Sequence, residues 1–155
     1  MLHINKEVIS AIISHARKEL PNEACGYLAG LEGIITKHYE LTNIDHSPEH
    51  FSFDPAEQFQ TVKDARNKGL QIIANYHSHP VTPARPSVED IRLAYDPNIS
   101  YVIISLAQPE ADVKSFRIVN GDVVKEEIEL IDNWQLTVDS WELTIIHSQL
   151  SILNY

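Results

Sequence analysis

The chain has 155 residues, of which 43% are hydrophobic and 22% are charged, and this length is sufficient for one domain with a buried core. Its formal net charge of −10 argues against a nucleic-acid-binding protein, because such a protein needs a basic face. No apolar run is long enough for a membrane span, and the N-terminus lacks the pattern of a signal peptide. One cysteine, Cys25, excludes an internal disulfide framework and suits the reducing cytoplasm, so we expect a cytoplasmic globular protein.

Three elements are predicted in the first third of the chain. Apolar residues recur at helical spacing from 5 to 20, with Asn5 as the N-cap and Pro21 just beyond the end. The apolar run ACGYLAG (24–30) predicts a buried strand, and alternation over 33–42 predicts a second one. Glu23 then lies at the mouth of the first strand, where local sequence alone describes it as a solvated turn residue.

The rest of the chain predicts a short strand at 51–54, a helix at 55–68, a central strand at 70–76, a helix at 87–95, a buried strand at 99–107 and a hairpin over 112–130. Pro55 suits the first position of its helix, which would turn Phe59, Val62 and Ala65 inward. Asn120-Gly121 is the strongest two-residue hairpin signal. The element order predicts an α/β protein of the α+β type, with a mixed β-sheet flanked by helices.

The segment 131–155 has a different composition. It holds both tryptophans and no lysine or arginine, and its pattern fits neither a helix nor a strand consistently. We therefore expect a domain over residues 1–130 and a C-terminal tail over 131–155 without assigned structure. The apolar side chains of the tail must be covered, which leads to the hypothesis of a homodimer built through it.

Two histidines follow the predicted central strand directly. Side chains at i and i+2 of a strand point the same way, so His77 and His79 present both imidazoles to one side. Pro80 cannot continue the sheet ladder, which places the pair at a strand end, open to a cleft. Together with Asp90, the pair forms a ligand set that zinc favours. Three protein ligands leave the fourth tetrahedral position for water, which is typical of a catalytic site.

Part of this pattern has a purely structural interpretation. Ser87-x-x-Asp90 resembles a capping box, and an acidic residue in the first turn suits the helix dipole. Read alone, these two residues indicate a helix start, and a lone His-x-His also occurs by chance. The joint pattern is more specific, because a helix start, a strand-end histidine pair and a short connecting loop all coincide.

Glu23, His77-x-His79 and, seven residues later, Ser87-x-x-Asp90 together resemble the signature of the JAMM (MPN+) metallohydrolases at every motif position. The segments LPNEACGYLAG, FDPAEQF, YHSHP and ARPSVEDIRLAYDP are similar to the small bacterial members of that family. The resemblance covers about residues 1–130 and implies a JAMM/MPN-like, cytidine-deaminase-like architecture. It does not extend to the tail.

The resemblance also implies roles for these residues. His77, His79 and Asp90 would bind one zinc ion per chain. Glu23 would accept a proton from the attacking water and later deliver it to the leaving amine. Ser87 would donate a hydrogen bond to the developing oxyanion. Cys25 lies within an apolar run and is interpreted as a small buried hydrophobe, not a nucleophile.

The family implies hydrolysis of an amide bond after the C-terminal Gly-Gly of a ubiquitin-like protein. Small bacterial relatives resemble peptidases that act on sulfur-carrier proteins, some of which release cysteine and so belong to cysteine biosynthesis. We therefore predict a zinc metallopeptidase whose partner is the tail of a ubiquitin-like sulfur carrier, docked along an exposed strand edge. Two alternatives stay open: a non-catalytic MPN-type scaffold, and a peptidase for small peptides.

Overall fold

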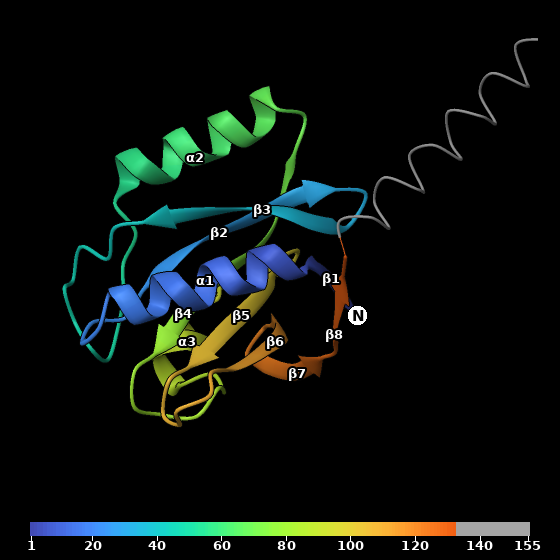
Figure 1. Cartoon of the computed structure of the whole chain (residues 1–155). Helices are drawn as coiled ribbons and strands as arrows, with labels where there is room; N and C mark the ends of the chain where they lie inside the picture. The colour runs from blue at the N-terminus through green and yellow to red at the C-terminus, as the bar shows by residue number, and fades with distance from the viewer. Residues whose placement is uncertain (133–155) are drawn as a thin grey trace, which may run out of the picture.

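The computed structural model describes residues 1–132, which form one eight-stranded sheet and three helices (Figure 1). In chain order the elements are β1 (Leu2–Asn5), α1 (Lys6–Lys18), β2 (Cys25–Leu31), β3 (Ile34–Leu41), α2 (Pro55–Asn67), β4 (Gln71–His79), α3 (Val88–Arg92), β5 (Ser100–Ser105), β6 (Asp112–Val119), β7 (Asp122–Glu126) and β8 (Ile128–Ile131). The strand order is β7-β6-β5-β4-β2-β3-β1-β8. The pairs β4–β5, β1–β3 and β1–β8 are parallel and the others antiparallel, so the predicted mixed sheet flanked by helices is confirmed.

The C-terminal tail lies outside the described residues, apart from Ile131 and Asp132. The hypothesis of a dimer built through the tail therefore stays a prediction.

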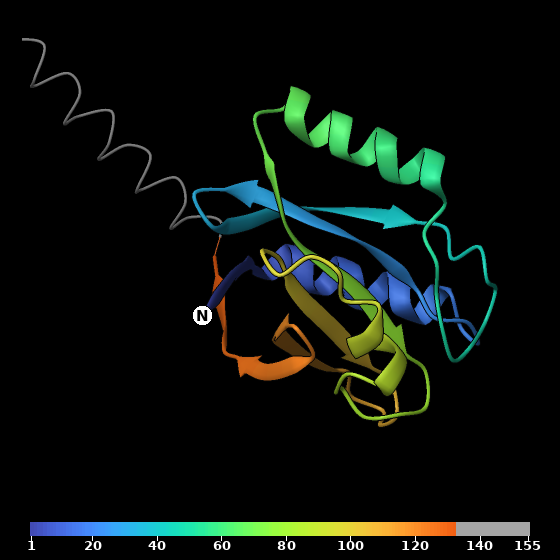
Figure 2. The ribbon, with the colours of Figure 1, turned by 180° about the vertical axis from the view of Figure 1, so that it is seen from behind.

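Strand β4 lies in the middle of the sheet and divides it into two environments. It pairs with β2 on one side and with β5 on the other. Helix α1 covers one face, which we call the α1 face, while α3 and the loop before it lie on the opposite face, which we call the open face (Figures 1 and 2). Since side chains alternate along a strand, Ala74, Tyr76 and Ser78 point to the α1 face. Asn75, His77 and His79 therefore point to the open face.

Helix α1 forms and packs as its sequence predicts. The Asn5 side chain accepts a hydrogen bond from the backbone N–H of Glu7 at 2.8 Å, which caps the helix. Val8, Ile12 and Ala16 are buried against the sheet in the main core, which on the sheet side contains Leu2, Ile4, Ala24, Leu28, Ile35, Ala74, Tyr76, Val102 and Ile104. The apolar stripe therefore fixes which side of α1 faces the sheet.

Helix α2 has the predicted ends but not the predicted inward face. It begins at Pro55 behind the N-cap Asp54, and Gly69 follows it with a left-handed φ of 71°. Ala65 is 1% exposed, but Phe59 is 67% and Val62 is 38% exposed, so the prediction for these two side chains is wrong. The buried residues of α2 are Thr61 and Ala65, and such a narrow contact needs no wide apolar stripe.

Two further predictions are corrected in the loops around the site. Residues 51–54 do not form a strand, because Phe53 makes only an isolated bridge to Asn43. Phe51 and Phe53 instead pack beside Cys25 and Tyr27 in a second cluster on the open face. Helix α3 ends at Arg92 and is therefore much shorter than the predicted 87–95.

The sheet curls until its two edge strands meet at one corner. Asn120 and Gly121 have φ values of 50° and 83°, and this confirms the predicted hairpin between β6 and β7. A single residue, Glu127, separates β7 from β8, and its carbonyl accepts a hydrogen bond from the Leu2 N–H at 2.7 Å. Strand β8 then pairs with β1 at the opposite edge of the strand order.

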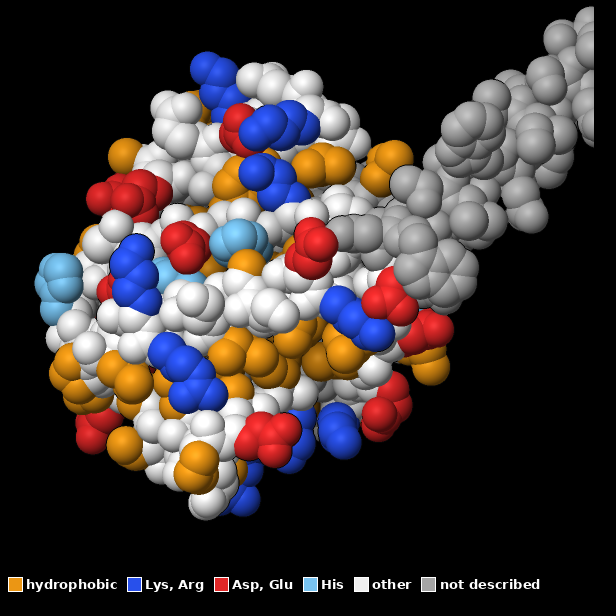
Figure 3. Space-filling model, viewed as in Figure 1, with side chains coloured by type: hydrophobic (Ala, Val, Ile, Leu, Met, Phe, Trp, Pro, Cys, Tyr) orange, Lys and Arg blue, Asp and Glu red, His pale blue; other side chains and the backbone are white. Residues whose placement is uncertain are grey.

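Charged side chains of both signs lie on the surface of the described residues. On the face shown in Figure 3, acidic and basic side chains are interspersed and do not form a single-sign patch. Within residues 1–132, no helix combines the length and the hydrophobicity needed to traverse a bilayer.

Candidate metal centre and active site

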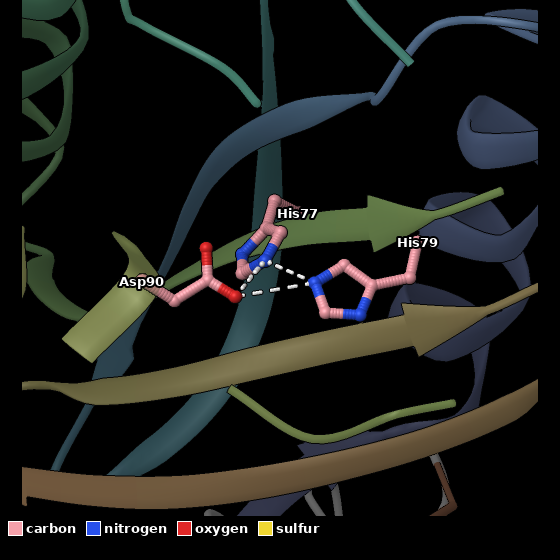
Figure 4. Close-up of side chains that lie close together, drawn as sticks. All are labelled: His77, His79 and Asp90. Atoms are coloured by element: carbon pink, nitrogen blue, oxygen red, sulfur yellow. Dashed lines mark hydrogen bonds and ion pairs between the residues drawn. The ribbon is translucent and has the colours of Figure 1, made fainter. Parts of the chain in front are cut away.

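Three ligand-type atoms converge at the end of β4 (Figure 4). The Nε2 atoms of His77 and His79 lie 3.0 Å apart. The Oδ2 atom of Asp90, from the first turn of α3, lies 3.3 Å from the first nitrogen and 3.2 Å from the second. The structure thus brings together the three residues that the sequence predicts as ligands.

The spacing of these atoms fits a tetrahedral metal ion. Ligand atoms about 2.0–2.1 Å from a zinc ion would be separated by roughly 3.3 Å along a tetrahedral edge. The three separations in the structure, from 3.0 to 3.3 Å, agree with that edge. The His79 Nδ1 atom lies 2.9 Å from the Pro83 carbonyl, which can only accept, so it carries a proton. In neutral His79 the lone pair is therefore on Nε2, which faces the Nε2 atom of His77 and the Oδ2 atom of Asp90. Because such atoms act as electron-pair donors, a bound cation would satisfy all three.

The two imidazoles are held in different ways. His79 is oriented by its hydrogen bond to the Pro83 carbonyl, the kind of second interaction that metal-binding histidines usually make. The Nδ1 atom of His77 is buried and has no hydrogen-bond partner among the described residues. Its ring is stacked on Phe51, with centroids 4.7 Å apart and planes 27° apart. Phe51 therefore orients the ring of His77 by packing, and the sequence did not predict this contact.

Burial and hydrogen bonding set the protonation of the triad. Burial lowers the pKa of His77 despite its hydrogen bond to Asp90. Burial also opposes protonation of His79, but its hydrogen bonds to Asp90 and to the Pro83 carbonyl outweigh this effect and raise its pKa. Burial would raise the pKa of Asp90, yet hydrogen bonds from His77 and His79 bring it well below its usual value. Asp90 is thus an ionised carboxylate, as a metal ligand requires.

Strand pairing places Glu23 next to the triad. Cys25 pairs with His77 in the antiparallel β2–β4 ladder, and the Ser78 N–H extends this ladder by donating to the Ala24 carbonyl at 3.0 Å. One position further along, Glu23 lies opposite His79 and on the same face, since directly opposed residues share a face. The Ser78 hydroxyl, on the α1 face, also accepts a hydrogen bond from the Ala24 N–H at 2.8 Å. Ser78 therefore fastens the strand that carries the histidines to the strand that carries Glu23.

The loop between β3 and α2 fixes the Glu23 backbone. The Glu23 N–H donates to the Ser47 carbonyl at 2.9 Å, and the Asn43 side chain donates to the Glu23 carbonyl at 3.0 Å. Asn43 is buried and also donates to the His50 carbonyl at 3.1 Å. The loop that supplies Phe51 to His77 thus also holds Glu23, so one segment positions both parts of the site.

The Glu23 carboxyl is poised to exchange a proton near neutral pH. It is 4% exposed, and its Oε2 atom has no hydrogen-bond partner among residues 1–132. Burial raises the pKa of Glu23 to about 8, with the charge of His79 acting in the opposite direction. A carboxyl with this pKa is suited to act as a general acid or base. Cys25, by contrast, is buried, and burial raises the pKa of its thiol to about 12, which fits the expected inert hydrophobe.

Ser87 forms the predicted capping box and lies beside Asp90. Its Oγ accepts a hydrogen bond from the Asp90 N–H at 3.0 Å, and its own N–H donates to Asp90 Oδ2 at 2.8 Å. The helix start therefore orients the carboxylate that completes the triad. Within the described part of the chain the Ser87 hydroxyl proton has no acceptor, and the residue is exposed, so this proton is available to a ligand.

A groove of roughly 580 Å³ lies on the open face, and His77 and Asp90 are among the residues that line it. Its lining is mostly apolar and includes five aromatic rings, from Tyr27, Phe51, Phe53, Tyr95 and Tyr101. A groove of this size and character is typical of a ligand site. It connects directly with the metal centre.

The fold and the candidate metal centre are typical of a hydrolase domain, and comparisons with known proteins agree. The chain matches the Prok-JAB family, described as prokaryotic homologs of the JAB domain, over residues 5–119. It is 34% identical over 137 residues to a CysO-cysteine peptidase of Mycobacterium tuberculosis, covering 86% of this chain and 94% of that protein. A solution structure of a Desulfitobacterium hafniense protein is 50% identical over 86% of this chain and 94% of the other, with a TM-score of 0.80.

A JAB1/MPN domain protein of Archaeoglobus fulgidus shares the fold, with a TM-score of 0.59, 19% identity, and coverage of 84% of this chain and 97% of that one. The chain belongs to the prokaryotic JAB family, the small prokaryotic branch of the JAMM/MPN+ proteins. It is a hydrolytic enzyme of the JAMM type, and the predictions of family, fold and enzyme class are confirmed. The scaffold alternative is therefore set aside.

Proposed function

We propose that the protein is a zinc-dependent peptidase that cleaves the amide bond after the C-terminal Gly-Gly of a ubiquitin-like sulfur-carrier protein. The observation that carries the proposal is the convergence of two imidazole nitrogens and one carboxylate oxygen at tetrahedral spacing. Next to them lies the buried carboxyl of Glu23, whose Oε2 atom has no hydrogen-bond partner within residues 1–132. The similarity to a CysO-cysteine peptidase over nearly the whole of that protein supports a carrier-type substrate.

In this proposal His77, His79 and Asp90 hold one zinc ion per chain. When bound, the ion supplies a Lewis acid that polarises the substrate carbonyl and acidifies water. Glu23 accepts a proton from the attacking water on its carboxylate and passes it to the leaving nitrogen, because an amine leaves far more readily once protonated. Ser87 donates a hydrogen bond from its hydroxyl group to the carbonyl oxygen as negative charge develops there.

The groove on the open face is the proposed path of the carrier tail. The expected docking along a strand edge beside the metal is not available, since β4 pairs on both sides with β2 and β5. A tail can instead lie across the face of the sheet, with its end at His77 and Asp90. A peptidase for small peptides remains the second candidate, because the same groove can hold a short peptide.

Metal analysis and cleavage assays test the proposal together. Purified wild-type protein is expected to contain about one zinc ion per chain and to cleave a carrier–cysteine adduct or a carrier–protein conjugate until a chelator is added. His77→Ala should lose both the metal and the cleavage. His3→Ala is the matched control, because His3 is a partly exposed histidine paired with Glu129 on β8. Metal-loaded protein that cleaves short peptides but no carrier substrate would favour the second candidate, and cleavage of neither would refute the proposal.

We keep cytoplasmic localisation and a homodimer as proposals. The dimer is tested by deleting residues 133–155, a cut that leaves β8 intact because this strand ends at Ile131. An unchanged oligomeric state in solution would contradict a dimer built through the tail.

A further inference from the structure

Two cross-strand rows of residues lie beneath the groove. In the row nearest the candidate metal centre, His77 on β4 lies between Cys25 on β2 and Ile103 on β5, and of these three His77 and Ile103 line the groove. In the next row, Asn75 lies between Tyr27 and Tyr101. Asn75 is the residue that β4 contributes to the second row, and its polar side chain points to the same side as the two histidines.

The side-chain amide of Asn75 has no hydrogen-bond partner in the part of the chain that the structure describes. Its Oδ1 atom is buried without a hydrogen bond, and no hydrogen bond engages its Nδ2 atom within residues 1–132. The neighbouring hydroxyl groups bond elsewhere: the Tyr27 oxygen accepts from Gln58 Nε2 at 2.7 Å, and the Tyr101 hydroxyl donates to the Asp96 carbonyl at 2.7 Å. Buried polar groups are nearly always paired, so an unpaired amide on the floor of a ligand groove indicates a group that pairs with a ligand.

The spacing of the two rows selects the part of the substrate that reaches Asn75. Residues i and i+2 of a strand are about 6.8 Å apart, which is also the length of two extended residues of a bound peptide. In the binding mode that we propose, the peptide runs along β4 with its reacting carbonyl near His77, which puts its second neighbouring residue above Asn75. If the leaving group is a single amino acid, it does not extend so far, so the residue above Asn75 belongs to the carrier tail.

The chemistry of that tail suits an amide. Glycine residues offer only backbone carbonyl and N–H groups, and the Asn75 amide can hydrogen-bond to either. Because Oδ1 is covered in this structure, Nδ2 is the end that faces the groove. We infer that Asn75 binds the carrier tail by donating a hydrogen bond from Nδ2 to a backbone carbonyl about two residues before the scissile bond. This inference rests on the proposed function. It specifies which part of the substrate the groove recognises, namely the backbone of the carrier tail.

The first test measures binding of a free tail peptide ending in Gly-Gly to the zinc-loaded protein by fluorescence anisotropy. Asn75→Leu should weaken binding about fivefold to tenfold, the usual effect of one lost hydrogen bond. Asn75→Asp should weaken it further, since a carboxylate cannot donate to a carbonyl. The melting temperature of Asn75→Leu should not fall, because removing an unpaired buried acceptor is neutral or stabilising. A merely structural asparagine would show the opposite pattern.

The second test locates the contact on the peptide. Tail peptides in which one backbone amide at a time is replaced by an alkene isostere keep the extended shape and lose the carbonyl and the N–H of that amide. At the position two residues before the tail end, the replacement should weaken binding to wild type about as much as Asn75→Leu does. The same replacement should cost the Asn75→Leu variant little, and this non-additivity is the signature of a direct contact.

Gln58→Leu is the matched control, since Gln58 also lines the groove but has a partner in Tyr27. It should lower the melting temperature, and its effect on binding should add to that of every alkene replacement. The inference is overturned if wild type does not bind the tail, if Asn75→Leu binds it within twofold of wild type, or if all replacements act additively with Asn75→Leu. Binding that depends on Asn75 without any cleavage would instead refute the proposed function and leave the inference standing.

Discussion

The two faces of β4 differ in how completely their polar groups are paired. On the α1 face, the Tyr76 hydroxyl bonds to His15 at 2.8 Å and the Ser78 hydroxyl bonds to the Ala24 N–H at 2.8 Å. On the open face lie all three buried side-chain atoms that lack a partner within residues 1–132: Glu23 Oε2, Asn75 Oδ1 and His77 Nδ1. Alternate residues of one strand thus serve two purposes. Substitutions on the α1 face should change stability, and those on the open face should change activity.

Glu23→Gln should produce the largest effect on the open face. The amide cannot accept a proton from water, so the rate of carrier cleavage should fall by about 10²–10⁴-fold, the usual contribution of a general base. The zinc content should stay near one per chain, because Glu23 is not among the ligand atoms. Glu49→Gln, in an exposed position of the nearby loop, is the control. A cleavage rate within tenfold of wild type would remove Glu23 from the proton-transfer role.

Ser87→Ala should reduce both activity and stability, because Ser87 starts α3 and also faces the site. Loss of one donor to the oxyanion should lower kcat by about 10²–10³-fold. Loss of the cap should lower the free energy of unfolding by about 1 kcal/mol. Ser87→Thr keeps the hydroxyl and should restore most of both quantities, as measured by steady-state kinetics and denaturant unfolding. An alanine variant that loses stability alone would limit Ser87 to its capping role.

The raised pKa of Glu23 predicts a pH-dependent stability of the metal-free protein. In the folded state burial raises its pKa to about 8 from the ordinary value of 4.5, so the folded protein keeps a proton that the unfolded chain releases. The stabilisation is complete below about pH 4.5 and is lost as the pH rises towards 8, by a total on the order of a few kcal/mol. Glu23→Gln lacks this titration. The unfolding free energy of wild type minus that of Glu23→Gln, measured in a chelator, should therefore decrease from pH 5 to pH 8.5. A difference that is constant with pH would show that Glu23 titrates normally.

Tyr76→Phe tests the α1 face, where the effect should be on stability. The change leaves the buried Nδ1 of His15 without its partner and should lower the free energy of unfolding by about 1–3 kcal/mol. Zinc content and kcat should be unchanged, although Tyr76 is adjacent to His77 in the chain. Tyr95→Phe, at a residue that is 80% exposed, should change stability by less than about 0.5 kcal/mol. A loss of zinc in Tyr76→Phe would contradict the separation of the two faces.

The sequence predicted those features that depend on short spacing. The histidine pair at a strand end, the cap at Ser87 and the Asn120-Gly121 hairpin each involve a few consecutive residues, and the structure contains all three. Strands β1 and β8 have four residues each, too few to display a period, and they exist because they pair with each other.

Features set by tertiary contacts could not be predicted from local patterns. The location of Glu23 depends on the β2–β4 register, so only the family resemblance pointed to it. The stacking of Phe51 on His77 requires a loop to fold back over the site, and a strand was predicted there instead. Asn75 lies two residues before His77 and, by the alternation of β4, on the same face. Its lack of a partner, however, depends on every side chain around it.

The two hydrogen bonds between Ser78 and Ala24 determine which part of the protein would have to be transferred to build this site in another fold. A segment from Asn75 to Asp90 transplanted into a foreign sheet would carry the ligands and the helix start that orients Asp90. It would not carry the neighbouring strand whose offset sets the carboxyl of Glu23 opposite His79. The smallest transferable unit is therefore the pair of strands β2 and β4 in their present register, which Ser78, between the two histidines, holds in place by hydrogen bonds.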